Sequence, residues 1–238
     1  MNEIETAPES KPKKYSRIVG VLIIVIALAG GLWLVFRPAK EIVKTADLHL
    51  DTTQQDQRNS LIEGIQNQIT AAEAKNASVE DRFKLYSQLG NEEYAIGAYD
   101  AARKALLTAQ KLLPDNPTSY QDLYTVYSAM HDYTAALDTI KKALELNSAS
   151  VANWTNYITL EKNQFGMSTA DRLKLFEQAV VKTANAPEIV HAYAETYEEK
   201  GDYIQAYNIY RTLVDKYPNN AQYHADVDRL VAKQNSPK

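Results

Sequence analysis

The sequence has no cysteine, and its 238 residues include only eight glycines and eight prolines. Without thiols the chain has no disulfide bonds, no thiolate metal sites and no cysteine nucleophile. Basic residues are in slight deficit, and the net charge at pH 7 is −4. Because phosphate contacts require clustered Lys and Arg, this balance argues against a nucleic-acid-binding protein.

Motifs for catalysis or ligand binding are also scarce. The four histidines are dispersed along the chain: His49, His131, His191 and His224. None has a neighbour at a metal-ligand spacing, and there is no glycine-rich phosphate loop. Adjacent carboxylates such as Glu92 and Glu93 point apart on a helix, which excludes paired acid–base chemistry. We therefore expect no enzyme activity, no cofactor, no metal and no small-molecule substrate.

One long apolar run lies near the N-terminus. Residues 18–36 read IVGVLIIVIALAGGLWLVF, without a charge, between Arg17 and Arg37. As a helix this run is about 28 Å long, close to the thickness of a bilayer core. A cleaved signal peptide is the alternative, because Ala27-Leu28-Ala29 has a small-x-small form, but large apolar residues follow it at 32–36. The run therefore predicts an uncleaved, single transmembrane helix.

The charges around this run bear on its orientation. Four basic residues precede the span and three follow it: Lys11, Lys13, Lys14 and Arg17, then Arg37, Lys40 and Lys44. This small excess favours a cytoplasmic N-terminus and an extracytoplasmic C-terminal part, as in a protein of the bacterial cytoplasmic membrane. Ala27 and Gly31 form a small-xxx-small pair, which leaves a homo-oligomer open.

The rest of the chain is organised by apolar periodicity. After a tail at 1–17 and the span at 18–36, we expect a juxtamembrane linker at 37–58. A helical stripe with Leu61, Ile62, Ile65 and Ile69 predicts a capping helix and connection at 59–82, started by Asn59 or Ser60. Ser78 and Asp81 form a capping pair for the next helix.

A repeat of 34 residues follows. Its first copy carries Tyr86-x2-Leu89-Gly90, Ala102-x3-Leu106, Ala109 and Pro114. Equivalent residues recur 34 residues on, as Tyr120-x2-Leu123, Ala136-x3-Ile140 and Ala143. Trp154 begins a third copy, whose longer turn at 163–168 adds two residues and whose second helix shows Leu173, Phe176 and Ala179. Val190, Gly201-x-Tyr203, Ala206-x3-Tyr210 and Pro218 make a fourth.

This pattern resembles the tetratricopeptide repeat, in which each unit is a pair of antiparallel helices. The resemblance implies an all-α superhelix of about four repeats, at 83–116, 117–150, 151–186 and 187–220, with a capping helix and tail at 221–238. Small residues such as Gly90 and Ala102 stand where two helix axes approach closely. Departures include Glu93 and Glu161 at a tyrosine position and His131 at a turn glycine. An irregular bundle is the alternative, which several matched positions in each copy disfavour.

In this family the first helices of the units line a groove that receives a peptide or helix. The resemblance therefore implies groove-facing candidates in each unit: Lys84, Ser87, Asn91 and Tyr94; Gln121, Thr125 and Ser128; Thr155, Thr159 and Lys162; Glu188, His191, Glu195 and Glu198. The middle of this set is polar and uncharged, which suits an extended backbone. Glu188, Glu195, Glu198 and Glu199 predict an acidic end that favours a basic partner.

The sequence thus predicts a membrane-anchored scaffold that binds a protein or peptide partner, in secretion or envelope assembly. The groove lacks the clustered Lys and Arg with which chaperone adaptors of this family clamp a carboxylate, since only Lys84 and Lys162 are basic there. The alternative is a structural or oligomerising subunit of an envelope machine such as a pilus or secretion apparatus.

Overall fold

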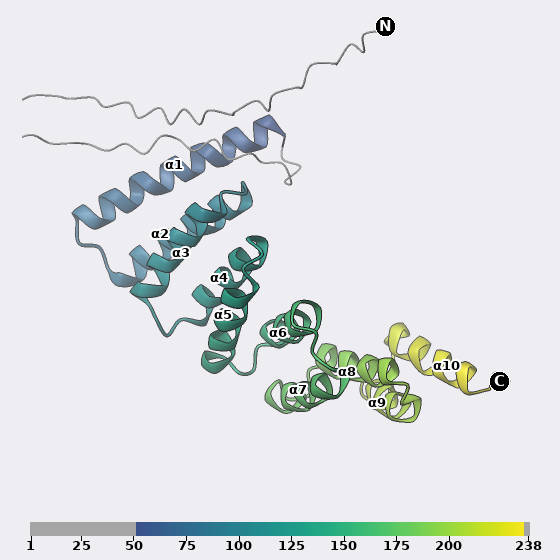
Figure 1. The fold of residues 1–238 in the computed structure, drawn as a ribbon. Coiled ribbons are helices and arrows are strands. Elements are labelled where there is room, and N and C mark those ends of the chain that lie inside the picture. The colour runs from purple at the N-terminus through teal and green to yellow at the C-terminus, as the bar shows by residue number, and fades with distance from the viewer. Residues whose placement is uncertain (1–50, 236–238) are drawn as a thin grey trace, which may run out of the picture. The chain divides into compact units, whose positions relative to one another are not determined.

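The computed structural model describes residues 51–235, which belong to one compact unit. This part contains ten α-helices and no strand (Figure 1). Within residues 51–235, no helix is both long and apolar enough to cross a membrane. The predicted tail at 1–17, the span at 18–36 and most of the linker at 37–58 lie outside the described residues.

The helices follow one another along the chain with short turns between them. Their bounds are α1 Thr52–Ala74, α2 Val79–Ala95, α3 Tyr99–Leu112, α4 Pro117–Ala129, α5 Tyr133–Leu146, α6 Val151–Gln164, α7 Thr169–Lys182, α8 Pro187–Lys200, α9 Tyr203–Lys216 and α10 Ala221–Asn235. Each helix packs against the next one in the chain, and the closest pairs are α2 with α3, α4 with α5 and α8 with α9. The prediction of an all-α array of helical hairpins is confirmed.

The helix starts and turns follow local chemistry. Ser78 caps α2 by accepting a hydrogen bond from the backbone N–H of Asp81, as expected. The turns inside three hairpins place one residue at positive φ: Gly97 at 77°, His131 at 58° and Gly201 at 83°. His131 therefore adopts the left-handed conformation of the glycine that it replaces, at a strain cost that glycine avoids.

Small side chains allow the two helices of a hairpin to approach closely. A Cβ atom on Gly90 would lie 2.5 Å from Cγ of Leu106 and 3.1 Å from the carbonyl oxygen of Ala102. Ala102, like its equivalents Ala136 and Ala206, is 0 % exposed. These contacts confirm that the small residues of the repeat mark the close approaches.

The first helix is longer than predicted. It begins at Thr52 rather than at 59, and Asp51 is its N-cap in a reciprocal capping box with Gln54. Asn59 and Ser60, which were expected to start it, lie inside the helix. The first two turns carry no apolar stripe, so their helical state depends on the capping box and on the continuation into the buried Ile62.

The third unit departs from the repeat at one buried position. When its two extra turn residues are allowed for, Arg172 stands where the other units have Ala102, Ala136 and Ala206. Arg172 is only 4 % exposed, and its guanidinium donates to Glu199 of α8. A large side chain at a close-approach position separates helices, and α6 packs much less extensively against α7 than α2 does against α3.

The last helix caps the array. α10 buries Val227 and Leu230 against α9, as a capping helix at 221–238 requires. Tyr223 packs at the edge of the same cluster. Val231, which follows Leu230, is 39 % exposed.

Candidate functional site

The first helices of successive units are joined side by side by polar contacts. α2 contacts α4, and α6 contacts α8. Between α4 and α6, Nε2 of Gln121 donates to Oδ1 of Asn153 at 2.7 Å. Between α6 and α8, Nζ of Lys162 donates to Oε1 of Glu199 at 2.8 Å. We call the side of α2, α4, α6 and α8 that carries these contacts the first-helix face.

The fourteen residues predicted to line the groove differ in exposure. Eight are exposed: Lys84, Asn91, Thr125, Thr155, Thr159, Lys162, Glu188 and Glu195. Six are partly buried: Ser87, Tyr94, Gln121, Ser128, His191 and Glu198. Exposed members occur on all four first helices, so a partner that crosses the face meets at least one of them in each unit.

Two threonine hydroxyl groups on this face are already used as donors within their helices. Oγ1 of Thr125 donates to the carbonyl oxygen of Gln121 at 3.1 Å, and Oγ1 of Thr155 donates to that of Val151 at 3.0 Å. Each hydroxyl oxygen keeps lone pairs as acceptors. The middle of the face therefore offers acceptors to the N–H groups of a bound backbone.

A carboxyl group that the sequence prediction missed lies next to Asn91. Burial raises the pKa of Asp122, while a hydrogen bond with the Asn91 side chain acts in the opposite direction. One carboxyl oxygen of Asp122 is buried without a partner in the described residues. The repeat pattern did not reveal Asp122 or Asn153, because the equivalent positions in the other units are not all polar.

The prediction of an acidic end at the fourth unit requires correction. Glu198 accepts hydrogen bonds from Arg229 of α10 and from the phenol of Tyr210. Glu199 pairs with Lys162 and with Arg172. These partners hold the pKa of both glutamates below the usual value, chiefly through Arg229 for Glu198 and Lys162 for Glu199. Both glutamates are therefore ionised, and basic side chains of the same fold compensate their charges.

Two further predicted carboxylates at this end are exposed and have no arginine or lysine partner in the described residues, Glu188 and Glu195. His191, a predicted groove residue, instead binds α10: its Nε2 lies 2.8 Å from Oδ2 of Asp226. Its ring also packs between Tyr210 and Tyr223, with centroids 5.3 and 5.7 Å away. His191 therefore joins α8, α9 and α10 rather than presenting a free imidazole to a partner.

Tyr94 and Ser128 are two more of the partly buried candidates, on α2 and α4. The Tyr94 ring lies 5.6 Å from that of Tyr99 and packs against the core between the first two units. Ser128 is half-buried on α4, in the turn after Tyr124. Both residues help to shape the first-helix face more than they extend from it.

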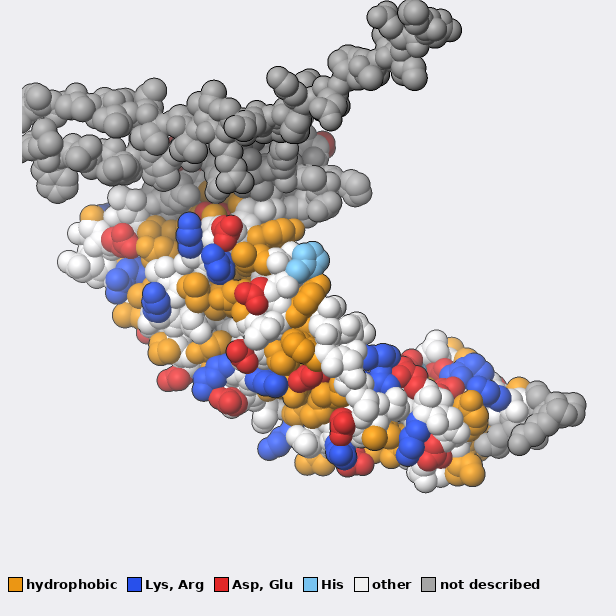
Figure 2. All heavy atoms as spheres, viewed as in Figure 1, with side chains coloured by type: hydrophobic (Ala, Val, Ile, Leu, Met, Phe, Trp, Pro, Cys, Tyr) orange, Lys and Arg blue, Asp and Glu red, His pale blue; other side chains and the backbone are white. Residues whose placement is uncertain are grey.

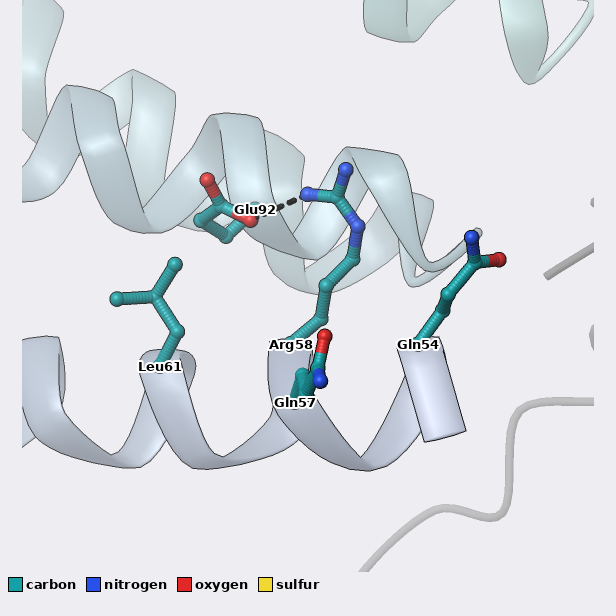
Figure 3. Close-up of a pocket in the computed structure, with 5 residues that line it drawn as sticks. All are labelled: Gln54, Gln57, Arg58, Leu61 and Glu92. Carbon is teal, nitrogen blue, oxygen red and sulfur yellow. Dashed lines mark hydrogen bonds and ion pairs between the residues drawn. The ribbon is translucent and has the colours of Figure 1, made fainter. Parts of the chain in front are cut away.

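The structure also contains a surface hollow that the sequence did not predict. It has a volume of about 380 Å³ and is lined by Gln54, Gln57, Arg58 and Leu61 of α1 and by Glu92 of α2. Figure 3 shows Arg58 reaching from α1 to Glu92, and their ion pair is 2.6 Å long. With its two charges paired and only amides and a leucine beside them, the hollow has no nucleophile or free base.

In residues 51–235 no group of His, Asp and Glu could hold a metal ion. The side shown in Figure 2 has basic and acidic residues interspersed, without a broad field of one sign.

The helical hairpins are similar to those of several solved structures. A tetratricopeptide repeat protein from Parabacteroides merdae ATCC 43184 superposes with a TM-score of 0.55 at 15 % identity, over 79 % of this chain and 69 % of that one. The chain has the tetratricopeptide-repeat fold. MamA gives a TM-score of 0.52 at 17 % identity, over 74 % of this chain and 99 % of MamA.

PilF of Pseudomonas aeruginosa, with the same repeat fold, gives a TM-score of 0.50 at 18 % identity, over 66 % of this chain and 70 % of PilF. No protein-family profile and no curated protein sequence matches the chain. Identities this low establish the tetratricopeptide-repeat fold alone. They assign none of the neighbours' partners to this chain.

Proposed function

We propose that this chain is a membrane-anchored scaffold that binds an extended segment of a protein partner on its first-helix face. The observation that supports this most is the row of exposed, mainly uncharged polar groups on α2, α4 and α6. Asn91, Thr125 and Thr159 occupy equivalent positions in three successive units, 34 residues apart. Because rigid helices hold these groups before binding, little entropy is lost when a partner docks.

The partner segment is defined by the chemistry of this face. Acceptor oxygens and amides suit a backbone in extended conformation, with modest demand on its side chains. Since Glu198 and Glu199 are paired within the fold, a basic partner gains less at the fourth unit than the sequence suggested. We therefore propose a polar or mildly basic segment, with Glu188 and Glu195 as the exposed acidic contacts.

We further propose that residues 18–36 anchor the scaffold in the bacterial cytoplasmic membrane, with the repeats outside the cytoplasm. The supporting observations are the uncharged run itself and the slight excess of basic residues before it. An anchor raises the local concentration of the binding face for partners at the same membrane. We therefore propose a role for the scaffold in secretion or envelope assembly.

Photo-crosslinking of the full-length chain in its native membrane tests the binding face. A photoreactive residue at Thr125 is expected to yield a specific protein adduct. The same residue at Val181, which is 76 % exposed on α7, serves as the control. Adducts at Val181 but none at Thr125 would contradict the proposal and favour binding through the second helices.

A further inference from the structure

Within residues 51–235, the array begins with half of a repeat. Each second helix ends four residues before the N-cap of the next first helix: α3 at Leu112 before Asn116, and α5 at Leu146 before Ser150. α1 ends at Ala74, four residues before Ser78. α1 is therefore a second helix, and within residues 51–235 it packs on α2 without a first helix of its own.

The side of α1 that corresponds to the inside of a hairpin is open. Counted from the helix ends, Leu61, Gly64 and Ala71 match Tyr99, Ala102 and Ala109 of α3. Ala102 and Ala109 are 0 % exposed, because α2 covers them. Their equivalents on α1 are uncovered: Leu61 is 43 % exposed, Ala71 is exposed, and a Cβ atom on Gly64 would meet nothing within 4 Å.

α1 has its own buried stripe elsewhere on its surface. Ile62, Ile65 and Ile69 pack with α2, and Gly64 lies on a different side of the helix. Leu61 lies between the two sides, one turn before Ile65 and next to Glu92 of α2. The hollow of Figure 3 lies at the N-terminal end of the open side and shares Leu61 with it. The open side carries no charged residue from Leu61 to Ala71, because Gln68 is the only other residue on it in this stretch.

The array ends with the other half of a repeat. Counted from the helix starts at Pro117, Pro187 and Ala221, Val231 of α10 corresponds to Tyr127 and Tyr197. Both tyrosines pack into the cores of their own hairpins. Val231 remains 39 % exposed, and Asp228 beside it is exposed as well. α10 is a first helix without a second helix after it in the described residues.

We propose that α10 of one copy docks on the open side of α1 of a second copy and so completes a hairpin between the two chains. In the α8–α9 hairpin, Tyr197 and Tyr203 pack against the same core. Their equivalents are Val231 and Leu61, so the shared register brings together two exposed apolar side chains. Gly64 provides the close approach that Ala206 provides in α9.

Polar groups also match in this register. Gly90 faces Leu106 across the first hairpin, and the equivalents of these residues are Asp228 on α10 and Gln68 on α1. An amide N–H of Gln68 is thereby placed to donate to the Asp228 carboxylate. Because α1 and α10 are the first and the last helix of the described residues, the contact is heterologous and leads to head-to-tail arrays rather than closed twofold dimers.

Chemical crosslinking of full-length chains in a mild detergent tests this contact. The chain has no cysteine, so Leu61→Cys in one preparation and Val231→Cys in another give unique thiols. When the two are mixed with a short bismaleimide, we expect a crosslinked dimer between them. Each variant alone, or Val181→Cys mixed with Val231→Cys, is expected to give none.

Gly64→Leu in the Leu61→Cys chain is the matched disruption. Since Gly64 has open space around it, the added side chain leaves the fold of one copy intact but blocks the approach of α10. Loss of the mixed dimer with unchanged helix content supports the proposal. Three results would each overturn it: reactive thiols without mixed dimer, a mixed dimer that survives Gly64→Leu, or a thiol of the Leu61→Cys variant that is shielded in dilute, uncrosslinked chains.

Discussion

Replacing Gly90 with leucine is expected to lower the free energy of unfolding by about 3 kcal/mol, because the new side chain overpacks the first hairpin. Even a Cβ atom there would lie 2.5 Å from Cγ of Leu106, and the backbone oxygen of Ala102 is only 3.1 Å away. Leu106 could shift, but a backbone carbonyl in the middle of α3 could not shift without separating the two helices.

Gly64→Leu is the control for this experiment, because it makes the same change in another helix where no atom lies within 4 Å. There the substitution is expected to raise stability by about 0.5 kcal/mol through better helix propensity. Urea unfolding followed by circular dichroism, with both variants dilute, measures the difference. If the two variants lose equal stability, a general effect of the larger side chain explains the result, and close packing at Gly90 does not.

The second large effect concerns a buried acid. Burial raises the pKa of Glu93 from 4.5 to about 7, and the charge of Lys104 acts in the opposite direction. Glu93 occupies the position of Tyr127 and Tyr197 in other units, and its Oε2 is buried without a partner in the described residues. A carboxyl group there is tolerated best when it is protonated and neutral.

The sign of the pH dependence follows from this shift. The folded state holds the Glu93 proton more tightly than the unfolded state, so its contribution to stability is lost as pH rises from 4.5 to about 7. Glu93→Gln removes the charge, and at about pH 8 we expect it to be more stable than the parent by about 2 kcal/mol. Near pH 4.5 the difference is expected to vanish.

Glu161→Gln is the matched control, at the equivalent position of the third unit. Glu161 is ion-paired with Lys141 at 3.5 Å, so its loss brings no gain at alkaline pH. Urea unfolding of the three proteins at several pH values makes the comparison. A Glu93→Gln variant with the same pH slope as the parent would show that Glu93 is not the buried acid responsible.

Most of the fold was predictable because each unit repeats one set of packing residues. Gly90 and Ala102 indicated where helices touch, and Ser78 indicated where one begins. The early start of α1 was missed because its first turns have no apolar stripe and depend on Asp51 and Gln54. Arg172 was missed because the two extra turn residues displace it from its alanine equivalents.

The binding face was less predictable, since charge depends on neighbours distant in sequence. At the acidic end, Arg229 and Arg172 compensate the charges of Glu198 and Glu199 from 31 and 27 positions away in the chain. Sequence alone showed the carboxylates but not these partners. The uncharged middle of the face was predicted more easily, because Thr125 and Thr159 need no distant group to define them.

The most direct measurement of the central claim is the order of crosslinks along the partner. Photoreactive residues at Asn91, Thr125 and Thr159, one per variant, are mapped by mass spectrometry onto the protein that each captures. If α2, α4 and α6 form one face for an extended segment, the three adducts fall in sequence order along a single stretch of one partner. Adducts scattered over the partner's surface, or three unrelated partners, would contradict the claim.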